Sequence, residues 1–170
     1  MKYTYSFIIR FILCFIPAAV FSIMFTQITI SAVYFLLSAY KPILINNLLI
    51  VKIYKFEFVE ACIVPYAYYF FWFLCLFTKD ILTKIRIKMI VYGFIMIFLM
   101  NILRIVFVID LAARYGLVWF NVVHLFIWHF ISGIYIAIVW VILVRHYKIK
   151  SIPFYSDIKE LYKRSIFNKK

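Results

Sequence analysis

The sequence has few acidic residues and few residues that break regular structure. Its 170 residues include six Asp or Glu, three Gly and four Pro. In their place the chain is apolar, with 68% hydrophobic residues and a mean hydropathy of +1.06. A soluble domain is about 45–50% apolar by a similar count. A water-soluble globule and a disordered chain are therefore both excluded, and the composition predicts an integral membrane protein.

The shortage of acidic residues leaves a formal net charge of +13, from 19 Lys and Arg against six Asp and Glu. In a soluble protein this excess would indicate nucleic acid as the partner. Here the basic residues stand at the ends of apolar runs and form no nucleic-acid recognition motif. They are typical of cytoplasmic loops of membrane proteins and of contact with anionic lipid, and no nucleic acid is expected as a partner.

Cysteine is also scarce, with an odd number of residues and no CxxC pair. The three are Cys14, Cys62 and Cys75. This pattern predicts neither a zinc site nor a disulfide framework. No metal and no cofactor are expected.

The apolar runs predict an all-α integral membrane protein with four to five transmembrane helices. The runs cover residues 5–25, 28–40, 62–78, 89–109 and 117–144, with a short loop expected at 110–116. About 20 residues cross a bilayer core. The run at 28–40 is short, so whether residues 28–41 span the membrane or lie at its surface stays open. We expect one multi-span membrane domain at 1–150 and a basic cytoplasmic tail at 151–170.

Residues 43–60 have a different pattern. An Asn-Asn pair interrupts two branched apolar runs, and residues 52–60 then alternate polar and apolar side chains. This predicts a short extended hairpin. The basic segments at 79–88 and 145–170 are expected in the cytoplasm, which puts the hairpin and Cys62 at the outer face. The orientation of the N-terminus stays open, although Lys2 and Arg10 favour the cytoplasmic side, with Arg10 reaching the interface.

Three polar side chains are expected at one depth. Cys62 opens its apolar run at the outer face. Arg104 lies about 6–9 Å below the outer end of its helix, and His124 lies at a similar depth in the last run. Helices joined by short loops tend to pack as neighbours, so the three residues are expected to meet. A charged residue inside a span costs at least about 2.5 kcal/mol and usually marks function.

Three further residues are alternative or supporting candidates. His129 competes with His124, because five positions along a helix turn the two side chains about 140° apart. Asn101 precedes Arg104 by three residues on the same helical face and is expected to orient the guanidinium. Glu60 precedes Cys62 by two residues and is either a positioning group or an exposed acid.

These residue types suit acyl transfer. A cysteine thiolate is a nucleophile, and a nearby cation is expected to lower the pKa of the thiol. A guanidinium stays charged when partly buried and can stabilise a developing oxyanion. A histidine can take up and return a proton near neutral pH. Cys62, Arg104 and His124 thus predict a cysteine-peptidase site.

At these positions the chain resembles the exosortase/archaeosortase family of membrane cysteine transpeptidases. The similar blocks are Glu60-Ala61-Cys62, Asn101-Ile102-Leu103-Arg104-Ile105, and His124-Leu125-Phe126-Ile127-Trp128. The segment 149–159 looks like that of the small archaeal members called pacearchaeosortases. The resemblance implies a catalytic triad at Cys62, Arg104 and His124, or at His129 in members with an His-x-x-x-Gly pattern.

The resemblance also implies substrates and location. The substrates would be secreted surface proteins with a C-terminal sorting signal, made of a short motif, a transmembrane helix and a basic tail. The enzyme would be a multi-pass protein of the plasma membrane. It would cut near the motif on the outer face and pass the acyl group to a lipid or another amine acceptor.

Three other functions remain open. An intramembrane Arg and His also occur in transporters and channels, although no inverted repeat is visible here. A non-catalytic membrane scaffold would tolerate replacement of Cys62. A membrane hydrolase that cuts without transfer differs from a transpeptidase only in its acceptor.

Overall fold

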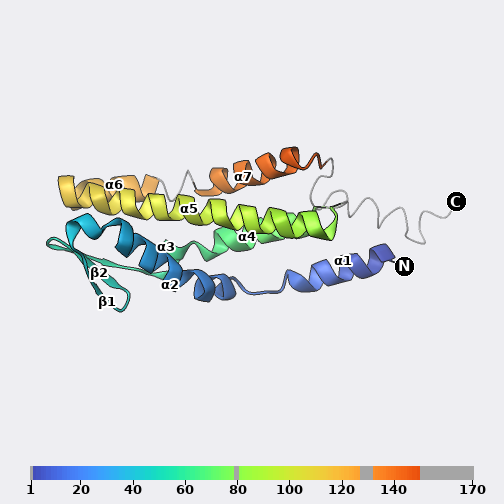
Figure 1. Cartoon of the computed structure of the whole chain (residues 1–170), viewed down its shortest axis with the longest axis horizontal. Helices are drawn as coiled ribbons and strands as arrows, with labels where there is room; N and C mark the ends of the chain where they lie inside the picture. The colour runs from blue at the N-terminus through green and yellow to red at the C-terminus, as the bar shows by residue number, and fades with distance from the viewer. Residues whose placement is uncertain (1, 79–80, 127–131, 150–170) are drawn as a thin grey trace.

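The computed structural model describes residues 2–78, 81–126 and 132–149 (Figure 1). The described chain is mostly helical, with one small antiparallel sheet. Its elements in chain order are α1 (Lys2–Leu13), α2 (Ala18–Leu36), η1 (Ser38–Tyr40), β1 (Ile43–Ile45), β2 (Leu48–Val51), β3 (Tyr54–Glu57), α3 (Glu60–Ile63), α4 (Pro65–Phe77), α5 (Thr83–Tyr115), α6 (Leu117–Phe126) and α7 (Ser132–His146).

The 33-residue helix α5 runs most of the length of the molecule, and α1 extends beyond one of its ends (Figure 1). One half of α5 is flanked by α2, the sheet and α6, and the other half by α1, α4 and α7. Direct contacts join α5 to α2, α4, α6 and α7. The N-terminal end of α1 and the C-terminal end of α7 lie at the same end of the molecule. The sheet lies at the opposite end, hereafter the sheet end.

Two of the described helices, α2 and α5, are long and apolar enough to cross a membrane. Three shorter apolar helices cover Pro65–Phe77, Leu117–Phe126 and Gly133–His146. A mostly helical chain with membrane-competent helices is therefore confirmed. The number of four to five spans stays a prediction.

The first two apolar runs are divided differently from the prediction. The run at 5–25 ends as a helix at Leu13, and α2 then continues without interruption through the expected boundary to Leu36. Pro17 stands just before α2 and lacks the N–H that a continuous helix would need. The freed carbonyls are satisfied by α4, where Trp72 Nε1 donates to Leu13 O at 3.1 Å and Tyr69 Oη donates to Cys14 O at 3.0 Å. Pairing of this kind satisfies the carbonyls at a helix break.

The predicted hairpin is present and has a third strand. The antiparallel sheet has the order β1-β2-β3, with register Ile45 opposite Leu48 and Val51 opposite Tyr54. Two-residue turns at 46–47 and 52–53 join the strands, and each begins with a residue of positive φ, Asn46 at 54° and Lys52 at 56°. Hairpins of this length favour such a residue because it matches the twist of the strands.

The predicted loop at 110–116 is wrong. Helix α5 continues to Tyr115, and Gly116 caps its C-terminal end. The φ of Gly116 is 92°, a value that glycine adopts readily. Asp110 and Arg114 stand one turn apart on the helix and form an ion pair at 3.0 Å. An acid four residues before a base supports a helix, a pattern that the loop prediction overlooked.

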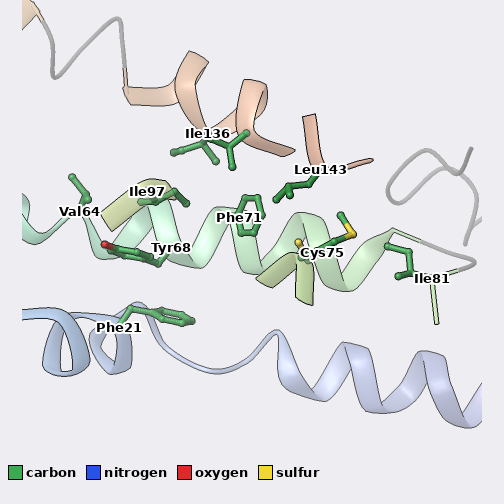
Figure 2. Packing of buried hydrophobic residues seen from close by; sticks show 11 residues of the cluster. Phe21, Val64, Tyr68, Phe71, Cys75, Ile81, Ile97, Ile136 and Leu143 are labelled. Atoms are coloured by element: carbon green, nitrogen blue, oxygen red, sulfur yellow. The ribbon is translucent and has the colours of Figure 1, made fainter. Parts of the chain in front are cut away.

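Two hydrophobic clusters fill the molecule. The first, hereafter the aromatic cluster, joins α2, α4, α5 and α7 around the fully buried Tyr68 and Phe71 (Figure 2). In it the ring of Phe25 stacks on Tyr68 with centroids 4.1 Å apart. The second lies at the sheet end, where Leu49 and Val51 of β2 pack on α2 and α5. These clusters fix the two halves of α5, and the candidate site lies beside the second.

Candidate functional site

Cys62 lies in a separate helical turn between the sheet and α4. The turn α3 ends at Val64, whose φ of 53° and ψ of 47° are left-handed, and α4 begins at Pro65. A branched residue in this conformation is strained by about 1–2 kcal/mol. Pro65 disfavours a helical conformation in the residue before it, which explains the break. Cys62 therefore does not open a continuous helix, as the sequence predicted, but lies in a separate turn before the 13-residue helix α4.

Two buried side chains of α5 hold the backbone of this turn. Asn101 Nδ2 donates to Cys62 O at 2.9 Å, and Arg104 donates through Nη2 to the same oxygen at 3.4 Å. Asn101 is 4% exposed and Arg104 is 7% exposed. The prediction placed Asn101 as a partner of the guanidinium. The structure instead makes both residues donors to one carbonyl at the end of a helical turn, where carbonyls lack partners within the helix.

The Cys62 cavity, about 300 Å³ in volume, lies between β3, α3, α5 and α6. Cys62 and His124 both line it, so the structure brings together these two predicted residues from separate helices. The full lining is Lys55, Phe56, Glu57, Phe58, Cys62, Ile105, Val108, Ile109, Leu117, Phe120, Asn121 and His124. The lining is mainly apolar with a few polar groups, which is typical of a binding site for a small molecule or a short peptide.

His124 is half-buried, and its ring is supported by aromatic neighbours. Phe120, one turn earlier on α6, stacks on it with ring centroids 5.4 Å apart and planes 3° from parallel. Phe120 in turn contacts Phe56 of β3 at 5.3 Å. The charge of Arg104 acts electrostatically on both His124 and Cys62, so the three predicted residues share one local environment. The competing His129 lies outside the described residues.

Three effects act on the pKa of the thiol, which lies in α3 and outside both long apolar helices. Burial raises the pKa of Cys62, while a backbone hydrogen bond at Val59 and the positive charge of Arg104 oppose this. Burial is the largest of the three effects, and the net pKa is raised. The charge of Arg104 lowers the pKa of the thiol, as expected of a nearby cation, but burial outweighs it. A thiol with a raised pKa needs a base to generate the thiolate.

Glu60 does not share this cavity. Its side chain is exposed and lines a second cavity of about 310 Å³ on the α2 side of α3, with Ser22, Thr26 and Asn47. Lys55, Glu57 and Phe120 line the Cys62 cavity instead, and the sequence reasoning did not name them. The signal for the first two was the alternating pattern at 52–60, which placed them on a strand leading to Cys62.

In the described ranges 2–78, 81–126 and 132–149, no group of three or more His, Cys, Asp or Glu could hold a metal ion. The three cysteines are free thiols. Comparison with known proteins finds no matching family model, no matching curated protein and no matching solved structure.

Proposed function

We propose that the protein is a membrane cysteine peptidase or transpeptidase that acts at the outer face of the plasma membrane. The observation that supports this proposal is the shared cavity of Cys62 and His124, with the Arg104 guanidinium held against the Cys62 backbone. A nucleophile and a proton carrier at one cavity, with a permanent cation bound to the backbone of the nucleophile, are groups that suit acyl transfer.

In the first step, His124 accepts the proton of the Cys62 thiol, and the thiolate attacks the carbonyl carbon of the scissile peptide bond. A C–S bond forms and the carbonyl oxygen becomes an oxyanion, which the Arg104 charge stabilises. The C–N bond then breaks, and His124 returns its proton to the leaving amine. This leaves a thioester on Cys62.

In the second step, an amine acceptor or water attacks the thioester carbonyl and His124 accepts its proton. The C–S bond breaks, and the thiolate leaves and is protonated again by His124. An amine acceptor gives transfer, and water gives hydrolysis. Both outcomes use the same residues, so the acceptor decides between them.

The substrate and the membrane orientation belong to this proposal as well. The sheet end would face outside, with α5 and α2 crossing the bilayer and the basic segment 79–88 inside. Substrates would be surface proteins that carry a C-terminal apolar helix and basic tail. Their acyl groups would pass to a lipid or another amine acceptor near the outer leaflet.

The decisive test compares cells with wild type, Cys62→Ala and Cys75→Ala. Cys75 is also a cysteine in an apolar helix, but it is fully buried in the aromatic cluster and serves as the matched control. The C-termini of all membrane proteins would be mapped by mass spectrometry. We expect Cys62→Ala cells to retain precursors with an apolar helix and basic tail, which the other two strains cut.

Added hydroxylamine would test for the thioester, because it attacks a thioester and leaves a hydroxamate at the new C-terminus whether the natural acceptor is an amine or water. Identical C-termini in the Cys62→Ala and wild-type cells would refute the peptidase proposal.

A further inference from the structure

The free edge of β3 borders the Cys62 cavity. The sheet has the order β1-β2-β3, so in the described part of the chain β3 pairs on one side alone. Four consecutive residues at 55–58 line the cavity. Side chains of consecutive strand residues point to opposite faces of a sheet. A cavity that touches all four must therefore meet the strand along its edge, where the backbone is accessible.

The register identifies which backbone groups face that edge. Phe58 donates its N–H to Asn47 O at 2.8 Å, so Phe58 and Asn47 form a hydrogen-bonded antiparallel pair. Such pairs alternate with pairs whose N–H and C=O groups point away from each other. Glu57 opposite Leu48 and Lys55 opposite Ile50 belong to the second kind. The backbone N–H and C=O groups of Lys55 and Glu57 consequently point away from β2, towards the cavity.

We propose that the substrate binds the Cys62 cavity in an extended conformation, as a fourth strand paired with Lys55 and Glu57. This inference rests on the proposed function and specifies how its peptide substrate is held. The backbones of Lys55 and Glu57 offer two N–H donors and two C=O acceptors, and a peptide strand beside β3 can form hydrogen bonds with all four. Because β3 leads through four residues into Cys62, the paired strand lies beside the nucleophile.

This mode of binding explains the composition of the site. An unpaired strand edge can pair with another chain, and proteins usually protect such edges from this. Here the edge of β3 faces the cavity beside the candidate nucleophile. Recognition through the backbone gives affinity without dependence on substrate sequence, and side-chain pockets add selectivity. The exposed Lys55 and Glu57 side chains flank the same edge, and Phe56 and Phe120 form an apolar wall on the cavity.

The test measures binding of a fluorescein-labelled Thr-Val-Thr-Val-Thr-Val peptide to the purified Cys62→Ala protein in detergent, so no turnover is required. Two isomers of the peptide carry three N-methyl groups each. In one isomer the groups are on the second, fourth and sixth amides, which share one edge of an extended strand. In the other they are on three consecutive central amides and block both edges.

We expect the first isomer to bind like the unmodified peptide and the second to bind about tenfold more weakly, because it loses hydrogen bonds worth about 1 kcal/mol each. Equal binding of the two isomers, or no binding of the unmodified peptide, would overturn the proposal. The isomers have the same composition, so apolar or side-chain binding cannot separate them.

A pair of protein variants supplies the complementary comparison. Glu57→Pro removes the outward N–H without breaking a bond to β2, whereas Glu57→Gln removes the charge and keeps the N–H. We expect weaker binding of the unmodified peptide in Glu57→Pro alone. Equal losses in both variants would assign recognition to the Glu57 side chain and overturn the edge proposal. Because these measurements need no cleavage, they remain informative if the proteolysis experiment fails.

Discussion

Along α5, the half that carries Met89, Gly93 and Ile97 packs into the aromatic cluster, whereas the half that carries Asn101 and Arg104 borders a cavity. Each half, together with the helices that flank it, holds buried or partly buried polar groups that donate to main-chain carbonyls at helix ends. The difference is what lies beside these donors. In the aromatic half the donors meet the C-terminal carbonyls of α4, and in the sheet-end half they meet the carbonyl of Cys62, a residue that lines a cavity.

Arginines illustrate the difference. Beside the aromatic half, Arg10 of α1 is 5% exposed and donates to Leu76 O at 3.0 Å. Arg86 donates to Cys75 O at 3.1 Å and to Thr78 O at 2.9 Å. Both arginines therefore satisfy the C-terminal carbonyls of α4, where a positive charge is favourable. A buried arginine in this chain indicates helix capping first, and the chemical role that we propose for Arg104 depends on the nearby cavity and thiol.

The largest expected effect separates two of these arginines. Arg104→Gln keeps a donor near Cys62 O but removes the charge, and we expect substrate cleavage to fall about 10²–10³-fold, as when an oxyanion-stabilising group is lost. Arg86→Gln removes a capping charge far from the cavity and is expected to lower the melting temperature while cleavage by the folded protein is kept. Cleavage of an identified substrate and thermal unfolding in detergent are the measurements. Equal cleavage by the two variants would remove the functional distinction between the halves.

The second effect concerns the thiols of the two halves. Because burial raises the pKa of Cys62, its reaction with a small maleimide should accelerate about tenfold per pH unit from neutral pH upwards, without levelling near the ordinary thiol pKa. Arg104→Gln should slow the reaction further at a given pH, since it removes a charge that favours the thiolate. Cys75, at 0% exposed, should stay unlabelled in the folded protein. A Cys62 rate that is independent of pH above neutrality would show a thiol that is already ionised.

The third effect tests how tightly the aromatic half is packed. A Cβ added at Gly93 would lie 2.0 Å from the ring of the fully buried Phe71, whereas a Cβ added at Gly133 meets nothing within 4 Å. Gly93→Ala should lower the free energy of unfolding by about 1–3 kcal/mol through overpacking. Gly133→Ala should raise it by about 0.5–1 kcal/mol, because alanine is the better helix former. Thermal unfolding of both variants in detergent would check the pair, and a stable Gly93→Ala protein would show that the cluster can yield.

The sequence predicted more of the site than of the helix boundaries. Hydrophobic runs show where helices lie but not where each one ends. Pro17 divides the predicted run at 5–25 into two helices, and no residue near position 26 ends α2 at the predicted boundary. The hairpin was predictable because its alternation is local, while the third strand was concealed by the shortness of β1. Asp110 and Arg114 were assigned to a loop because charge outweighed their helical spacing.

Within the site, depth counting brought Cys62, Arg104 and His124 to one region without knowledge of any contact. Depth does not specify the direction in which a side chain points, however. For that reason the sequence did not predict that Glu60 lines the second cavity, and it paired Asn101 with the guanidinium of Arg104 instead of the carbonyl of Cys62. The outward edge of β3 could not be predicted either. It depends on the register between β2 and β3, and a shift of one residue would have turned Lys55 and Glu57 towards β2.

The smallest effect concerns how the sheet is attached to α5. Tyr40 Oη donates to Asp110, and Lys52 Nζ donates to Ala113 O at 2.8 Å while lying 5.4 Å from the Tyr40 ring centroid. Tyr40→Phe keeps the ring beside Lys52 and removes one hydrogen bond, so the free energy of unfolding should fall by about 1 kcal/mol. Tyr40→Leu also removes the ring and should cost about 0.5–1 kcal/mol more. Hydrogen exchange at 43–57 should rise in the same order, because these contacts hold the sheet against the end of α5. Weaker peptide binding at β3 in the Tyr40 variants would show that the contacts between the sheet and α5 position the edge of β3. Unchanged binding would show that pairing with β2 alone positions this edge.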